Sequence, residues 1–271
     1  MKKISKIILS IFVTTILLSG CGVKFGIESR RNNKINDFIN RNSTNKDGEK
    51  VNIKESIEGI SNLDIEIDVS NLNIMYYDGE EVEISGVLGE ESEGIKVDKN
   101  FNELEIEEKY NNSNNLNSDT SSDLTIKIPS SYNGNLKLSL GVGSCKVKDL
   151  ILESMEVNAG VGELYIEDVS FNELNLESGL GDININTNKK TGDMNIKGGV
   201  GNINITLGDI NGNLKFEGGL GDATIVIPED APVNIKTSSG LGSVNASAKT
   251  SGENKYLFDI NMGIGELNIK N

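Results

Sequence analysis

The sequence lacks the residue types on which most enzyme chemistry depends. It contains no histidine and no tryptophan, and its two cysteines are Cys21 and Cys145. Without histidine, neither a Ser/His nor a Cys/His nucleophile pair can form, and the commonest general base is absent. Two cysteines do not make a disulfide framework. We therefore expect no catalytic residue, no cofactor and no metal, and paired carboxylates leave a surface polysaccharide hydrolase as a distant alternative.

Positive charge is also scarce. The chain has 26 Lys and Arg against 41 Asp and Glu, a formal net charge of -15, and its arginines (Arg30, Arg31 and Arg41) all precede residue 42. Removing the three lysines of the amino-terminal leader leaves 23 basic residues (26 − 3), and 23 − 41 gives -18. Such a chain repels phosphate backbones, so a nucleic-acid partner is excluded.

The amino terminus has the layout of a secretory leader. Lys2, Lys3 and Lys6 precede a mostly apolar run from Ile7 to Leu18, which is short for a membrane span. Leu18-Ser19-Gly20-Cys21 follows and resembles the bacterial lipobox. The resemblance implies that residues 1–20 are a lipoprotein signal peptide and that a diacylglycerol on Cys21 anchors the chain to the membrane, on the outer face of the cytoplasmic membrane. An uncleaved signal anchor or an ordinary secretory leader is the alternative.

Residues 21–50 and 51–271 differ in pattern. The first segment has polar clusters and no sustained hydrophobic period, which predicts a flexible tether. From Val51 onward apolar and polar residues alternate, as in Leu63, Ile65 and Ile67, which predicts strands. We therefore expect a single β-strand repeat domain over 51–271.

A Gly–apolar–Gly triplet recurs through the second half of this domain. The copies are Gly141-Val142-Gly143, Gly160-Val161-Gly162, Gly179-Leu180-Gly181, Gly199-Val200-Gly201, Gly219-Leu220-Gly221, Gly240-Leu241-Gly242 and Gly263-Ile264-Gly265. Successive first glycines are 19, 19, 20, 20, 21 and 23 residues apart. A period near 20 residues is typical of a stacked coil, so we predict an all-β, single-domain β-solenoid.

Each triplet changes the parity of the apolar pattern. Leu174 and Leu176 lie five and three residues before Gly179, whereas Ile183 and Ile185 lie four and six residues after it. A flat strand keeps a period of two, so the triplet must be a corner or bulge between two strands. Glycine suits such a corner because it adopts positive φ without a Cβ penalty. We expect the apolar residue in the middle of the triplet to turn into the core.

Three sets of residues in the repeats are candidate sites. Cys145 occupies a place that is apolar in the other repeats, which indicates core packing rather than redox chemistry. Glu163, Asp182, Asn202 and Asp222 each follow a triplet and should form one column, either a solvated edge or a Ca²⁺ site. Asn184, Asn204, Asn245 and Asn268 should point outward as an amide ladder, or form a flat face that meets a glycan or protein.

Three stretches of the chain resemble the DUF4097 family of β-strand repeat proteins, whose members often carry the label adhesin. These are Leu124–Pro129, Val226–Val233 and the glycine triplets, of which Gly179-Leu180-Gly181-Asp182-Ile183 is the clearest. The resemblance covers residues from about 51 to the end. It implies a right-handed-coil-like β-solenoid at the cell envelope, with no family catalytic residues.

The sequence therefore predicts a lipid-anchored surface protein that binds or scaffolds and catalyses nothing, with an unknown protein or glycan as partner. The alternative is an accessory protein of an envelope-stress or transport system that binds a membrane protein. Because the ends of a solenoid are strand edges, the chain end at Asn271 is expected to form one, with no protecting feature evident.

Overall fold

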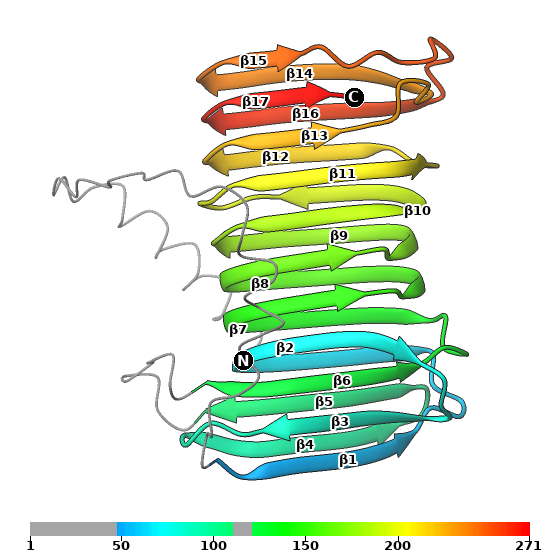
Figure 1. The fold of residues 1–271 in the computed structure, drawn as a ribbon, viewed down its shortest axis with the longest axis vertical. Helices are drawn as coiled ribbons and strands as arrows, with labels where there is room; N and C mark the ends of the chain where they lie inside the picture. Colours follow the sequence, from blue (N-terminus) through cyan, green and yellow to red (C-terminus); the bar gives the residue numbers. More distant parts are fainter. Residues whose placement is uncertain (1–47, 111–120) are drawn as a thin grey trace, which may run out of the picture. The chain divides into compact units, whose positions relative to one another are not determined.

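The alternating residues form strands throughout the part of the chain that the structure, a computed structural model, describes: residues 48–110 and 121–271. These strands join in one 17-stranded sheet that winds into a coil (Figure 1). No helix in these ranges is long and apolar enough to cross a membrane. The predicted signal peptide, Cys21 and most of the predicted tether lie outside the described residues.

The described residues form 17 strands. The strands are β1 (Lys50–Ser56), β2 (Asn62–Tyr77), β3 (Glu81–Val87), β4 (Ser92–Asn100), β5 (Glu103–Tyr110), β6 (Ser122–Pro129), β7 (Asn135–Lys148), β8 (Ile151–Glu167), β9 (Ser170–Leu180), β10 (Ile183–Lys197), β11 (Ile203–Ile210), β12 (Leu214–Leu220), β13 (Ala223–Val226), β14 (Val233–Leu241), β15 (Val244–Ala246), β16 (Tyr256–Ile264) and β17 (Leu267–Lys270).

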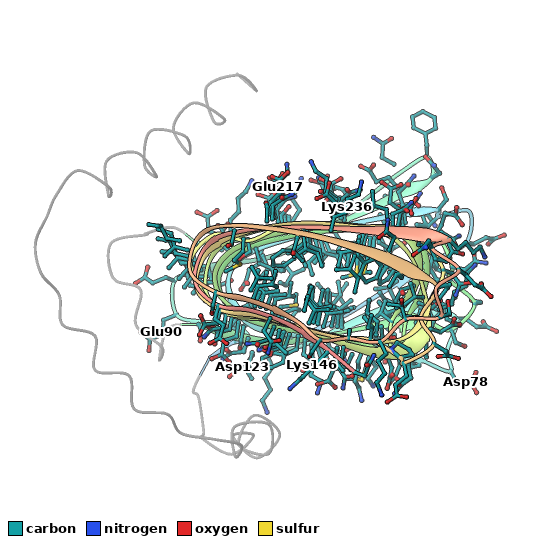
Figure 2. The ribbon with its side chains drawn as sticks, turned by 90° about the horizontal axis from the view of Figure 1, so that it is seen from above. Asp78, Glu90, Asp123, Lys146, Glu217 and Lys236 are labelled. Carbon is teal, nitrogen blue, oxygen red and sulfur yellow. The ribbon has the colours of Figure 1, made fainter. Side chains whose placement is uncertain are left out.

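Each turn of the coil, or rung, crosses two faces. Residues before a triplet lie on what we call the first face, and residues after it lie on the second face. In the end-on view of Figure 2 the coil is a flattened oval, with Glu217 and Lys236 on one long side and Asp123 and Lys146 on the other. Neighbouring rungs from β2 onward pair in parallel, as β7 and β8 do in register from Asn135↔Ser154 to Lys148↔Glu167, whereas at the β1 end β1 pairs with β3, β3 with β6 and β4 with β5 in antiparallel. The predicted β-solenoid is confirmed.

The core is built from columns of inward side chains, one from each rung. One first-face column contains Leu63, Leu136, Met155, Leu174, Met194, Leu214 and Phe258, all buried. Because every rung adds its apolar residues to the same columns, a rung gains its stability from its neighbours rather than from itself.

The glycine triplets are the corners of the coil, as predicted. The second glycine of every triplet has φ between +137° and +147°. Rungs also approach too closely at the corner for a side chain: a Cβ on Gly162 would lie 1.5 Å from the carbonyl oxygen of Gly143, and one on Gly199 would lie 1.9 Å from that of Gly179. Glycine is therefore required at both positions. The first position has no room for a Cβ, and the second has no room for a Cβ and also adopts positive φ.

The prediction that the middle residue of the triplet faces the core is wrong. Val161, Leu180 and Val200 are each 45–46% exposed. The inner side of the bend is already filled by core residues of the flanking strands: Ile203 Cδ1 lies 2.5 Å from where a Cβ on Gly198 would be. The middle side chain therefore points outward from the convex side.

The rungs do not stack in sequence order. The rung formed by β16 and β17 pairs with β12 and β13 on one side and with β14 and β15 on the other. The last segment of the chain thus lies inside the stack, as Figure 1 shows from the red strands between orange and yellow ones. At the other end, β2 lies between β7 and the pair β5 and β6 in the same way.

Hydrophobic burial explains this order at the carboxyl-terminal end. Inward residues of β16 and β17 include Ile260, Leu267 and Ile269, all 0% exposed. Their partners in β14 and β15 are Thr237, Val244 and Ala246, which are exposed. A rung with large apolar side chains gains more from two neighbours than a rung with small or polar ones.

The strand edge expected at Asn271 is accordingly elsewhere. Asn271 Nδ2 donates to the carbonyl oxygens of Ile227 (3.2 Å) and Lys249 (3.1 Å), which tie the chain end to the rungs on both sides. The open edge at this end of the stack is formed by β14 and β15, each of which pairs on one side only among the described strands.

A pair of valine substitutions tests the corner. Gly181→Val should lower the free energy of unfolding by at least about 3 kcal/mol, because it places a β-branched side chain at φ +137° and a Cβ 1.7 Å from the Gly162 carbonyl oxygen. Asn184→Val, on the outward side of β10, should cost less than about 1 kcal/mol. Denaturant unfolding measures both, and the reverse order would refute the corner assignment.

Candidate binding surface

The outward residues of the corners form one continuous aliphatic column, which we call the corner ridge. Its members are paired rung to rung in the order Val142, Val161, Leu180, Val200, Leu220, Ile264 and Leu241. Val142 is half-buried, and the exposure of the other six ranges from 39% at Leu220 to 69% at Leu241. With rungs about 4.8 Å apart, the ridge is about 30 Å long.

Each ridge residue is flanked in the sequence by two glycines, so its side chain has no side chain beside it in the same corner. No neighbouring side chain of the same corner can cover it, because both flanking positions lack a Cβ. Scattered exposed hydrophobic residues are normal on protein surfaces, whereas a contiguous apolar strip indicates an interaction site. The sequence already indicated this candidate interaction site, because each triplet has Val, Leu or Ile at a corner position where a solvated turn would have a polar residue.

The predicted acidic column runs beside the ridge. Asp182 Oδ1 accepts a hydrogen bond from the backbone N–H of Asn202 (2.8 Å), Asn202 Oδ1 from that of Asp222 (3.1 Å), and Asp222 Oδ1 from that of Glu266 (2.8 Å). These side chains thus satisfy the backbone of the next rung where each second-face strand begins. Glu163 instead accepts from the Tyr165 hydroxyl at 2.7 Å. The described residues contain no group of three or more His, Cys, Asp or Glu placed to hold a metal ion.

The predicted asparagine ladder is present in part. Asn184 and Asn204 are adjacent on the second face, and Asn204 Nδ2 donates to Asn184 Oδ1 at 3.1 Å. Thr224 then interrupts the column, and Asn268 and Asn245 pair in register beyond it. This face is flat and polar, because its rungs are parallel and in register.

Cys145 lies in the core, as its position predicted. It is 1% exposed and forms no disulfide, and burial raises the pKa of its thiol well above its ordinary value. A buried thiol of raised pKa is a poor nucleophile, so it serves as a small apolar side chain.

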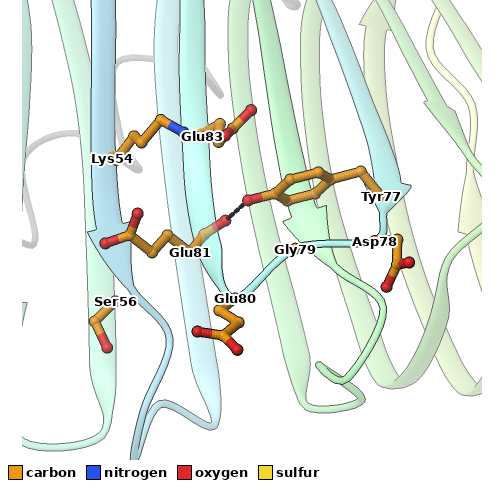
Figure 3. A pocket seen from close by; sticks show the side chains of 8 residues that line it. All are labelled: Lys54, Ser56, Tyr77, Asp78, Gly79, Glu80, Glu81 and Glu83. Atoms are coloured by element: carbon orange, nitrogen blue, oxygen red, sulfur yellow. Dashed lines mark hydrogen bonds and ion pairs between the residues drawn. The ribbon is translucent and has the colours of Figure 1, made fainter.

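A shallow hollow lies at the β1 end of the stack (Figure 3). It has a volume of about 480 Å³ and is lined by Lys54, Ser56, Tyr77, Asp78, Gly79, Glu80, Glu81 and Glu83. The Lys54 ammonium contacts the Glu83 carboxylate at 2.5 Å, and the Tyr77 hydroxyl donates to the carbonyl oxygen of Glu81. The Lys54 ammonium and the Tyr77 hydroxyl therefore each contact another residue that lines the hollow.

A carboxylate is buried near the same end. Glu108 is 0% exposed, and its Oε1 accepts hydrogen bonds from the hydroxyls of Ser122 and, at 2.8 Å, Ser92. Its Oε2 has no hydrogen-bond partner among the described residues. Burial raises the pKa of Glu108, the two serine hydrogen bonds oppose the rise, and the nearby charge of Asp68 adds to it. Because no oxygen of Glu108 reaches solvent, this acid is structural.

The raised pKa of Glu108 predicts a pH-dependent stability. Its folded pKa lies above the ordinary value of 4.5, so its contribution is complete below about pH 4.5 and is lost as the pH rises through the folded pKa. Glu108→Gln removes this titration. Thermal melts from pH 4.5 to pH 8 should show the variant gaining stability relative to the parent chain as the pH rises.

The exposed Glu156 supplies the matched control for that series. Glu156→Gln should leave the pH profile parallel to that of the parent chain. If Glu108→Gln did the same, the buried carboxyl would have no part in the pH dependence.

Comparison with known proteins identifies the family. The family model described as Toastrack DUF4097 matches residues 60–259, which is most of the chain. This match covers the strands from β2 to β15 and so includes most of the corner ridge. No curated protein matches the sequence significantly.

Solved structures that resemble this chain include three bacterial proteins. A candidate cell adhesion protein from Clostridium sporogenes shares 20% identity, covers 82% of this chain and 98% of its own, and superposes with a TM-score of 0.37. A candidate adhesin from Bacteroides fragilis shares 14% identity (82% and 97% covered, TM-score 0.42). Another from Parabacteroides distasonis shares 12% (83% and 98%, TM-score 0.40). With the family model spanning its rungs and corners, this chain belongs to the DUF4097, or Toastrack, family.

Proposed function

We propose that this protein is a lipid-anchored β-solenoid of the bacterial cell envelope that binds a partner through its outer surface and catalyses no reaction. The corner ridge carries the proposal. An aliphatic strip about 30 Å long is costly to leave in water, and a regular stack of rungs holds it in a fixed shape. A rigid apolar strip loses little conformational entropy when a partner covers it, which favours binding.

The chemistry of the described residues supports a binding role over a catalytic one. Cys145 and Glu108 are sealed in the core, and Lys54 and Tyr77 in the hollow are engaged with Glu83 and Glu81. A general acid or base must reach a substrate within hydrogen-bond distance. The polysaccharide hydrolase alternative therefore gains no support from these residues.

The amino-terminal pattern supports the envelope location and the anchor. A charged leader, a short apolar run and a Cys after small residues occur in the order of a lipoprotein signal. Diacylglycerol supplies two acyl chains, enough for stable attachment, because each buried methylene contributes about 0.8 kcal/mol. A protein held in this way presents its solenoid outside the cytoplasmic membrane.

Replacing the predicted lipidated residue tests the anchor. Cys21→Ser should abolish labelling of the protein by radioactive palmitate and shift most of it from the membrane pellet to soluble fractions. Ser19→Ala, which keeps a small residue beside the cleavage point, should leave both properties unchanged. Labelling that survives in the Cys21→Ser chain would contradict the proposed anchor.

Substitutions along the ridge test the binding role. The chain carrying Val161→Ser, Leu180→Ser and Val200→Ser should fold normally, because these side chains are outward and exposed. Each loses about 1 kcal/mol of apolar burial in a complex, so the three together should weaken binding about 100-fold. The measurement is cross-linking on intact cells followed by identification of the captured molecule, with a glycan array as the second assay.

Asn184→Ala with Asn204→Ala, on the flat second face, is the matched control and should retain the partner. A captured membrane protein of the same cell would identify an accessory role, and captured host, matrix or glycan material would identify an adhesin. Equal capture by the ridge variant and the parent chain would refute the ridge as the binding surface.

A further inference from the structure

The carboxyl-terminal end of the stack is open on both faces of the coil. β14 forms its edge on the first face and pairs only with β16, and β15 forms its edge on the second face and pairs only with β17. Alternate backbone N–H and C=O groups of both strands therefore have no strand partner among the described residues. Such edges are templates for pairing with another chain.

Three of the inward side chains of this rung are also uncovered: Thr237, Val244 and Ala246. Val244 is 38% exposed, whereas its partner Leu267 in the next rung is 0% exposed. Thr237 and Ala246 are exposed in the same way over the buried Ile260 and Ile269. Toward the corner and on the second face, the end of the core is therefore covered by one layer of small side chains, whereas Val233 and Ile235 cover it at the start of β14.

The two ends of the stack differ in the number of charged side chains that their edge strands carry. At the opposite end, the edge strands β1 and β4 carry Lys50, Lys54, Glu55, Glu93, Lys96, Asp98 and Lys99. Charged residues on edges are the usual protection against pairing. Over β14 and β15 the one charged side chain is Lys236. In a chain with a net charge of -15, this end is a surface where a second copy meets little repulsion.

We propose that β14 and β15 form a docking edge for a second copy of this chain, joined end to end by a two-fold axis. A partner that covers this end must offer two strands at once, about 10 Å apart, because the edge spans both sheets. A single extended peptide pairs with one strand and leaves the other open. A second copy presents two strands at the required separation, and a two-fold axis perpendicular to the stack makes every contact between copies antiparallel.

The size of the edge sets the strength of the contact. β14 has 9 residues, a length of about 30 Å, and the two sheets with their side chains are about 20 Å across, which gives about 600 Å² per copy. Stable interfaces bury about 800 Å² per partner. The pair is therefore a weak, reversible dimer that forms where copies are concentrated.

Charge placed between the copies tests this contact. Full-length protein in detergent is followed by sedimentation velocity from about 5 to about 500 µM, a range chosen for a weak dimer. The parent chain should dimerise within it. Thr237→Lys with Ala246→Lys places two positive charges on the inward side of the edge and should raise the dimer dissociation constant at least tenfold.

Asn234→Lys with Asn245→Lys is the matched control, because it adds the same charge to the same strands on their outward side. It should dimerise like the parent chain. Equal melting temperatures for the three proteins establish that all are folded. A parent chain that stays monomeric up to the highest concentration overturns the proposal, and so does a dimer that Thr237→Lys with Ala246→Lys leaves unchanged.

Cysteine cross-linking locates the contact independently. Thr237→Cys should give a dimer with a short bis-maleimide above the background of the parent chain, whereas Lys96→Cys, on β4 at the opposite end, should not. Cross-linking through position 96 alone would place the contact at the wrong end and overturn the proposal.

Discussion

The close approach of backbone to backbone at each corner is the constraint on which the rest of the structure depends. Parallel rungs in register bring the same corner atoms of successive turns together, and a Cβ at Gly162 would lie 1.5 Å from the carbonyl oxygen of the rung before it. Only glycine fits there, so the two faces can be joined by three residues and the rungs can share core columns without interruption. The middle residue, excluded from the filled inner side of the bend, becomes the corner ridge. The main candidate binding surface is thus a by-product of the device that lets the coil turn.

Burial orders the rungs once the corners allow them to stack. The rung of β16 and β17 has large inward residues such as Phe258 and Ile260, and it lies between two neighbours although it is last in the sequence. The rung of β14 and β15 has smaller or polar inward residues at most of the matching positions, such as Thr237 and Ala246, and lies at the end. Repeat proteins need terminal units that tolerate solvent on their outer side. Here β14 and β15, which precede β16 and β17 in the sequence, have this role, and Asn271 is held between rungs by its hydrogen bonds to Ile227 and Lys249.

The polar columns are mainly structural. Asp182, Asn202 and Asp222 use their side-chain oxygens to accept backbone N–H groups of the following rung, and Asn184 and Asn204 bond to each other. These hydrogen bonds account for the periodic acids and amides without a metal or a ligand. These hydrogen bonds do not explain the corner ridge or the edge formed by β14 and β15. The ridge has no structural partner among the described residues. Function is therefore best sought at these two surfaces.

The sequence by itself determined the solenoid, the corner positions, the inward column that contains Cys145 and the outward direction of the polar columns. All of these follow from the period of two in a strand and from the demand for glycine at a bend, which are local rules. The direction of the triplet's middle residue and the order of the last rungs were decided only by the tertiary structure. Whether Leu180 faces inward depends on how flanking core residues fill the bend, and whether β14 or β16 lies outermost depends on a competition for burial between segments. Such competition involves residues far apart in the chain, so no local pattern contains its outcome.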